Sequence, residues 1–195
     1  MKVIFLDFDG VINDYMTINE INEYNVKMLK RIVNESDSKV VVTSSWKYPY
    51  QRNNKNMEDF LNNNYYVRTL KENGIDIIDW TPYITTQWKK YNQREQEILE
   101  YLRNHPEITQ YLILDDDYII ESLKEHEIFL DLQAGLREKH IAPAIEILNG
   151  KLNFYHDCTD EQLSETSEQR VIRMNEIFHK LEKNIKKRDE EEEER

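Results

Sequence analysis

The amino-acid sequence predicts an α/β domain with an open, mostly parallel β-sheet flanked by helices. Short apolar runs typical of buried strands recur along the chain. Segments whose apolar residues repeat every three or four positions separate these runs, which is typical of helices that connect parallel strands. The chain has 195 residues, about the length of one domain with a short appendage, and no internal repeat divides it.

Each predicted strand is a short apolar run. Residues 39–43 contain three consecutive valines, whose branched side chains favour a buried strand. Residues 3–6 form a similar run near the N-terminus. The remaining predicted strands cover residues 75–78, 111–114 and 128–130. We expect these runs to pair in one sheet.

The helices are predicted from apolar spacing and from residues that start or stop helices. Thr17 and Glu20 match a capping box, which predicts a helix start just before the next apolar stripe. Pro106 cannot continue the helix before it, and Gly150 is typical of a helix end. The predicted helices cover residues 26–33, 57–61, 93–105 and 141–148.

The chain divides into a main domain, residues 1–150, and a C-terminal extension, residues 151–188. The main domain carries a small insert at residues 46–93. The extension is a polar, amphipathic helix with an apolar stripe of Val171, Met174, Phe178, Leu181 and Ile185. The stripe either folds back on the domain or, through the helix of residues 160–188, binds a second copy or a protein partner. Residues 189–195 begin with six consecutive acids and are predicted to be a solvated, disordered tail.

Composition excludes several classes of protein. The formal net charge of -12 argues against a protein that coats nucleic acid or an anionic membrane through bulk electrostatics. The single cysteine, Cys158, rules out an internal disulfide framework and a cysteine-based zinc site. No apolar run is long enough to span a membrane, and the N-terminal run is too short for a signal peptide. We therefore expect a cytoplasmic protein, or one from another reducing intracellular compartment.

Acidic and hydroxyl side chains follow three of the predicted strands. These residues are Asp7, Asp9, Thr43, Ser44, Asp115 and Asp116. Ligands of open α/β sheets bind beyond the carboxyl ends of the strands, so we expect these side chains to meet at one edge. Carboxylates that are brought together repel one another unless a cation joins them. Oxygen ligands of this kind suit a hard divalent ion, above all Mg²⁺.

Three of these segments resemble motifs of the haloacid dehalogenase (HAD)-like hydrolases. Asp7-Phe8-Asp9-Gly10-Val11 resembles motif I, Val40-Val41-Val42-Thr43-Ser44 resembles motif II, and Leu112-Ile113-Leu114-Asp115-Asp116 resembles motif IV. The chain is most similar to the HAD domain of "Swiss Army knife" RNA repair proteins. The features that carry this similarity are Ser44-Ser45-Trp46 and the helix Arg94-Glu95-Gln96-Glu97-Ile98. The resemblance covers roughly residues 1–150 and implies a Rossmann-like sheet with a minimal cap.

The resemblance also implies roles for the acidic residues. Asp7 would attack phosphorus and form an aspartyl-phosphate. Asp9 would protonate the leaving oxygen and later deprotonate the attacking water. Mg²⁺ would be held by Asp7, the backbone carbonyl of Asp9, and Asp115, with Asp116 bound directly or through water.

The phosphate group would also need hydroxyl and basic partners. Thr43, supported by Ser44, would bind the phosphoryl oxygens. HAD enzymes commonly place a lysine in motif III, and Lys89, Lys90 and Arg94 all lie in that region. We prefer Arg94, because it opens the helix of the family pattern and a guanidinium can bind phosphate through two hydrogen bonds. Lys89 is a second candidate for the phosphate, and a surface role for all three remains the alternative.

The segment between motifs II and III indicates the substrate. The 48 residues from 46 to 93 are too few for a large lid, which suits a bulky substrate such as a nucleic-acid end. Residues 39–94 hold nine Lys or Arg, five Asp or Glu, and all three tryptophans. Cations interleaved with aromatics can grip phosphates and stack bases. We predict a Mg²⁺-dependent phosphatase that acts on a nucleic-acid terminus, as in RNA repair. The alternatives are a nucleotidase for small nucleotides and a non-catalytic HAD-like interaction module.

Overall fold

The chain forms two units, Met1–Asp157 and Cys158–Arg195. The structure, a computed structural model, describes residues 1–14, 20–53, 55–84, 93–117 and 122–157, together with residues 159, 169, 172, 173, 176 and 179. The first unit holds the sheet and the helices described below. It extends past residue 150, where the sequence predicts the main domain to end.

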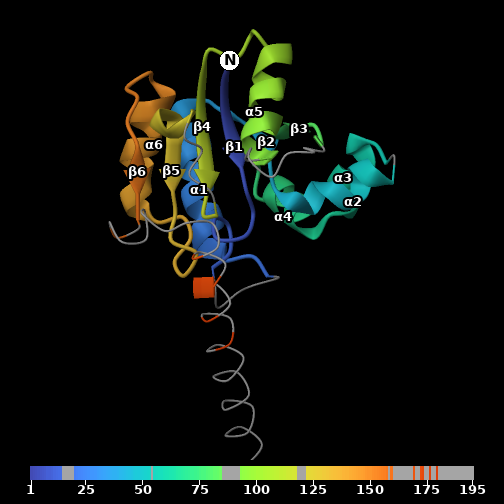
Figure 1. Cartoon of the computed structure of the whole chain (residues 1–195), viewed down its shortest axis with the longest axis horizontal. Helices are drawn as coiled ribbons and strands as arrows, with labels where there is room; N and C mark the ends of the chain where they lie inside the picture. Colours follow the sequence, from blue (N-terminus) through green and yellow to red (C-terminus); the bar gives the residue numbers. More distant parts are fainter. Residues whose placement is uncertain are drawn as a thin grey trace, which may run out of the picture. The chain divides into compact units, whose positions relative to one another are not determined.

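Within the described residues, six strands form one open, all-parallel sheet in the order β3-β2-β1-β4-β5-β6 (Figure 1). The strands are β1 (Lys2–Leu6), β2 (Lys39–Val42), β3 (Ile77–Trp80), β4 (Gln110–Asp115), β5 (Glu127–Phe129) and β6 (Tyr155–His156). Five of them overlap the predicted runs, whereas the two-residue β6 was not predicted. The sheet confirms the predicted fold class.

The helices are α1 (Glu23–Ser36), α2 (Tyr48–Arg52), α3 (Met57–Asn63), α4 (Tyr65–Glu72), α5 (Gln93–Asn104) and α6 (Ile141–Leu148). The start of α1 differs from the prediction, because its N-cap is Asn22. The Asn22 side chain accepts hydrogen bonds from the backbone N–H groups of Tyr24 and Asn25. Thr17, which was expected to cap this helix, lies outside the described residues.

Helices cover both faces of the sheet (Figure 1). Side chains alternate between the two faces along each strand. Ile4 and Leu6 of β1 belong to a large apolar cluster with residues of α1, α4 and α6, whereas Val3 and Phe5 pack with Ile98 and other residues of α5. Every second residue of β1 therefore faces α5, which fixes the direction in which the next odd-numbered residue, Asp7, points.

The register of the central strands brings their carboxyl ends level. Leu6 of β1 pairs with Val42 of β2 on one side and with Leu114 of β4 on the other. The backbone N–H of Asp7 donates to the Leu114 carbonyl at 3.0 Å, and the Thr43 N–H donates to the Leu6 carbonyl at 2.9 Å. The residues that follow these strands therefore share one edge of the sheet.

Much of the predicted insert, residues 46–93, is part of the main core. Phe60 of α3 and Tyr66, Val67 and Leu70 of α4 are buried in the same cluster as α1 and β1. The ring of Trp80 in β3 lies 5.0 Å from that of Phe60. These residues join the sheet edge to α3 and α4, so this part of the insert has a packing role.

In the second unit, residues 169, 172, 173, 176 and 179 are helical. The predicted apolar stripe of the extension and the acidic tail lie outside the described residues, so partner binding through residues 160–188 stays a prediction. In the described part of the chain, no helix combines the length and the apolar character that crossing a membrane requires.

Candidate active site

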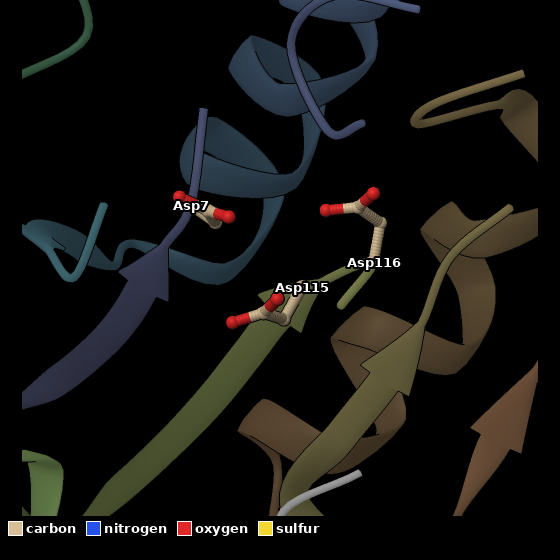
Figure 2. A group of neighbouring side chains, drawn as sticks. All are labelled: Asp7, Asp115 and Asp116. Carbon is tan, nitrogen blue, oxygen red and sulfur yellow. The ribbon is translucent and has the colours of Figure 1, made fainter. Parts of the chain in front are cut away.

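Three carboxylates meet at the carboxyl edge of the sheet. Figure 2 shows Asp7 after β1, and Asp115 and Asp116 at the end of β4, around one small space. One carboxylate oxygen from each residue lies within 4.8 Å of the other two, so the three could hold a metal ion. Asp7 and Asp115 are buried, and Asp116 is partly exposed. An all-oxygen set of this charge fits a hard divalent cation such as Mg²⁺.

Arg94 is the cation that the structure places against this cluster. It lies in the first turn of α5, on the side of the sheet that Asp7 and Asp115 face. Its Nη1 is 2.9 Å from Oδ2 of Asp7 and 2.6 Å from Oδ2 of Asp115. Burial alone would lower the pKa of Arg94, but the carboxylates of Asp115 and Asp7 raise that pKa well above its usual value. Arg94 therefore stays charged and holds two of the three acidic side chains in place.

Burial and mutual repulsion shift the acids of β4. Desolvation raises the pKa of Asp115 to about 7, although the Arg94 charge opposes the shift, and the Asp7 carboxylate adds to it. Desolvation, followed by repulsion from Asp7 and Asp115, raises the pKa of Asp116 well above its usual value. Shifts of this size in a cluster of acids are typical of catalytic and metal-binding sites.

The turn after β1 is shaped to fit this cluster. Gly10 has a positive φ of 65°, and a Cβ on Gly10 would lie 2.2 Å from Cγ of Asp116. Only glycine fits this close approach with its left-handed backbone. The N–H of Gly10 donates to Oδ1 of Asn13 at 2.8 Å, which fixes the turn. The absence of a side chain at Gly10 therefore leaves room for the Asp116 carboxyl group.

Asp9 lies in the same turn, and two side chains hold its carboxylate. Nε1 of Trp46 donates to Oδ2 of Asp9 at 2.9 Å, and Nδ2 of Asn13 donates to Oδ1 at 2.9 Å. Each carboxylate oxygen has a second lone pair for a further partner. The carboxylate of Asp9 is thus oriented from two sides without being enclosed.

The end of β2 contributes two buried hydroxyl residues. Alternation along β2 places Thr43 on the face that Val41 and α5 share. The Thr43 hydroxyl is buried and has no hydrogen-bond partner among the described residues, which suits a group that binds a ligand oxygen. Oγ of Ser44 accepts a hydrogen bond from the Trp46 N–H at 3.5 Å and so caps the short 3₁₀ turn Ser45–Lys47.

A buried ion pair behind the site was not predicted from the sequence. Nζ of Lys47 lies 2.7 Å from Oε2 of Glu97 and also donates to the Thr43 carbonyl at 3.0 Å. Neither charged side chain is exposed. Burial lowers the pKa of Lys47 to about 8, and the Glu97 carboxylate limits that shift. The pair joins the end of β2 to the helix that carries Arg94.

The structure therefore brings together Asp7, Arg94, Asp115 and Asp116. Asp9 lies in the turn that follows Asp7, and Thr43 and Ser44 follow the neighbouring strand β2. Lys89, the other expected phosphate partner, and Lys90 lie outside the described residues. Glu97 was visible in the sequence as part of the Arg-x-x-Glu-Ile pattern, and Lys47 directly follows Ser44-Ser45-Trp46. Nothing in their spacing showed that the two residues would meet.

The model of a protein family described as the HAD domain in Swiss Army Knife RNA repair proteins matches residues 3–141. The chain belongs to this family. The match begins in β1 and ends at the first residue of α6, so it contains the whole acidic cluster and Arg94. Membership confirms the resemblance that the motifs indicated. A comparison with curated proteins gave no match.

The buried cluster of Asp7, Asp115 and Asp116 is consistent with the active site of a HAD domain. Motif I supplies Asp7 and motif IV supplies the other two, from neighbouring strands of the sheet. The HAD domain therefore has its chemistry-bearing residues on the sheet edge at which open α/β folds bind ligands.

Proposed function

We propose that this HAD domain is a Mg²⁺-dependent phosphomonoesterase that removes the terminal phosphate of a nucleic acid. The observation that carries the proposal is the convergence of Asp7, Asp115 and Asp116 around one space, with Arg94 against two of them. Three carboxylates at this distance oppose one another unless cations accompany them. A dianionic phosphate ester also repels a carboxylate that approaches it, so the same cations would allow the attack.

Asp7 is the proposed nucleophile. Arg94 contacts Oδ2 of Asp7, which fixes the carboxylate and leaves Oδ1 to attack phosphorus in line with the leaving oxygen. A bond forms between Oδ1 and phosphorus while the bond from phosphorus to the leaving oxygen breaks. This divides one difficult displacement into two easier ones.

Asp9 is the proposed acid and base. It gives a proton to the leaving oxygen in the first step and takes one from the attacking water in the second step. The water oxygen then bonds to phosphorus, the bond to Asp7 breaks, and inorganic phosphate leaves. The hydrogen bonds from Trp46 and Asn13 hold Asp9 in the orientation that both transfers need.

The charge on the phosphoryl group is shared among several partners. Bound Mg²⁺, held by Asp7, Asp115 and Asp116 and by the backbone carbonyl of Asp9, would neutralise negative charge as the nucleophile approaches. The buried hydroxyl of Thr43 is a donor for one phosphoryl oxygen. Ser44 and Lys89 remain further proposed partners for the phosphate.

The family supports a nucleic-acid end as the substrate, because it is described as a domain of RNA repair proteins. The segment 39–94, with its excess of cations and all three tryptophans, agrees with such a substrate. The net charge of -12 favours brief, local contact with a phosphorylated end over tight binding along a strand.

A phosphate-release panel tests this function. Oligonucleotides with a 3′ or a 5′ phosphate are compared with mononucleotides at matched concentration, with Mg²⁺ and with chelator. We expect release from one class of oligonucleotide end, dependent on Mg²⁺ and absent in Asp7→Asn. Faster turnover of mononucleotides would overturn the assignment to nucleic-acid ends, and the absence of release from every substrate would overturn the assignment as a phosphatase.

A further inference from the structure

Trp46 lies directly beside the proposed acid of the site. It belongs to the 3₁₀ turn Ser45–Lys47, which follows the end of β2. Its indole Nε1 donates to Oδ2 of Asp9 at 2.9 Å, although the two residues are 37 positions apart in the sequence. The polar edge of this tryptophan is therefore fixed at the reaction centre.

The indole ring of Trp46 packs against other aromatic side chains. Its centroid lies 5.2 Å from the ring of Tyr66, and Tyr66 in turn stacks on the buried Phe8 at 5.2 Å. Tyr66 and Phe8 are buried, so the support is rigid. Offset and tilted aromatic contacts of this kind hold a ring in one orientation.

Trp46 nevertheless keeps 37% of its surface exposed. Trp80, by contrast, packs against Phe60 and the main core. An exposed apolar side chain is common and by itself shows nothing. The combination is informative: a large ring, oriented by a hydrogen bond and by a buried stack, presents open surface next to a catalytic carboxyl group.

We propose that Trp46 is a nucleobase subsite, on which the base of the leaving nucleoside stacks while its phosphate lies at Asp7. This inference rests on the proposed function and specifies the recognition step of the same site. It assigns Trp46 two tasks, since the indole N–H orients Asp9 and the indole ring binds the leaving group. Both tasks serve cleavage of the bond between phosphorus and the leaving oxygen.

The geometry of the reaction favours a nucleoside at this position. Asp9 must come within hydrogen-bond distance of the leaving oxygen to protonate it. The group attached to that oxygen therefore begins a few bonds from the indole that contacts Asp9. Every nucleobase has an aromatic face that can stack on tryptophan, whereas a sugar phosphate has none.

Stacking would also supply affinity for nucleic acid that the net charge of the protein does not. A chain with a net charge of -12 gains little affinity for nucleic acid from long-range attraction. A stacking contact is short-range and largely independent of base identity. We therefore expect recognition of a terminal nucleotide of any sequence, followed by ready release of the dephosphorylated end.

The test uses pairs of oligonucleotides that carry the same terminal phosphate, on the end that the panel identifies. One member has an ordinary terminal nucleotide, and the other has an abasic analogue there. For the wild type we expect kcat/KM to be about tenfold higher with the base present, in line with the usual contribution of one stacked base. Trp46→Leu should remove this preference.

Trp46→Phe separates the two tasks of the residue. Phenylalanine can still stack but has no N–H for Asp9, so the variant should keep most of the base preference and have a lower kcat. Tyr24→Leu is the matched control, because Tyr24 is also an exposed aromatic but its ring lies 5.5 Å from the guanidinium of Arg137. This control should keep the full base preference.

A binding measurement tests the subsite without turnover. The Asp7→Asn variant is titrated with such oligonucleotide pairs phosphorylated at the 3′ end and at the 5′ end, so the choice of pair needs no turnover, and we expect the abasic member to bind about tenfold more weakly at one of these ends. Equal binding of the two members at both ends, or an undiminished base preference in Trp46→Leu, would overturn the subsite. Failure of the proposed function has a different signature, since it would leave no oligonucleotide dephosphorylated and would not affect the binding comparison.

Discussion

Nζ of Lys47 lies 2.7 Å from Oε2 of Glu97, and neither side chain has exposed surface. Lys47 comes four residues after Thr43 and donates to its carbonyl, and Glu97 comes three residues after Arg94 on α5. The pair therefore holds the end of β2 at a fixed position relative to the helix that supplies the basic residue. Thr81 and Gln93 also donate to Glu97, at 3.4 and 2.9 Å, so the carboxylate is well satisfied.

Removing one partner of this buried pair should be strongly destabilising. We expect Lys47→Met to lower the free energy of unfolding by about 3–5 kcal/mol, because the Glu97 carboxylate would remain buried without its cation. The double variant Lys47→Met with Glu97→Leu should lose less than the sum of the two single variants. Urea denaturation of the four proteins in this cycle measures the coupling.

The exposed pair of Lys39 and Asp76 is the control for that cycle. Its atoms are 2.8 Å apart, but its side chains are 44% and 63% exposed. Lys39→Met should therefore change the free energy of unfolding by less than about 1 kcal/mol. Equal losses from Lys39→Met and Lys47→Met would contradict a special role for burial.

Arg94 should be essential for turnover. Arg94→Gln removes the charge against Asp7 and Asp115, and we expect kcat to fall by about 100-fold or more, as for loss of one preorganised donor. Arg94→Lys should recover only part of the activity, because an ammonium group lacks the planar geometry of the guanidinium. Arg103→Gln, on the exposed face of the same helix, is the control and should leave kcat unchanged.

Mg²⁺ should stabilise the protein through Asp115 and Asp116. A ligand that binds only the folded state adds about 2.7 kcal/mol at a hundred times its dissociation constant, so Tm should rise with the Mg²⁺ concentration. Asp115→Asn and Asp116→Asn should each reduce that rise. Asp76→Asn is the control, because the Asp76 carboxylate is 63% exposed and pairs with Lys39, and this variant should keep the full rise. A full Mg²⁺ response in Asp115→Asn would exclude the cluster as the metal site.

The site residues that could be predicted from the sequence are mainly those that directly follow the strands. Asp7, Thr43 and Asp115 follow apolar runs, and parallel strands bring such positions to one edge. Arg94 was placed by the Arg-x-x-Glu-Ile pattern, and the structure puts it in contact with two of the acids. The meeting of these residues at one edge of the sheet could therefore be predicted from the sequence.

Long-range polar contacts were not predictable in the same way. A lysine in a single sequence is normally exposed, so Lys47 gave no sign that it would be buried against a residue 50 positions away. The N-cap at Asn22 was missed because Thr17 and Glu20 matched a capping box, and β6 was missed because two residues carry no strand pattern.

Acid should destabilise the first unit through Asp157. Burial alone would raise the pKa of Asp157, but hydrogen bonds from His140 and Lys139 lower it to about 2. In the unfolded chain an aspartate has a pKa of about 3.9. Between these two values the unfolded state binds the extra proton, so stability falls as the pH drops from about 4 to about 2.

Asp157→Asn should flatten this pH dependence. Urea denaturation at several pH values between 4 and 2 gives the slope of the unfolding free energy against pH for the wild type and the variant. Asp76→Asn, at an exposed carboxylate, should leave the slope unchanged. An identical slope in the wild type and in Asp157→Asn would show that other groups dominate acid unfolding.

Gly10→Ala should disturb the metal site. Gly74→Ala is the comparison that separates the effect of the backbone conformation from that of the contact with Asp116. Gly10 and Gly74 both have left-handed backbone, with φ of 65° and 76°. Alanine in this region costs about 1–2 kcal/mol at either position. At Gly10, however, the new Cβ would also lie 2.2 Å from Cγ of Asp116, whereas at Gly74 the nearest atom is Nζ of Lys30 at 3.8 Å.

Both variants should therefore be less stable, but only Gly10→Ala should also weaken Mg²⁺ binding, measured by calorimetric titration, because only there must the Asp116 carboxylate move. Unchanged Mg²⁺ affinity in Gly10→Ala would mean that Asp116 does not hold the ion from its present position.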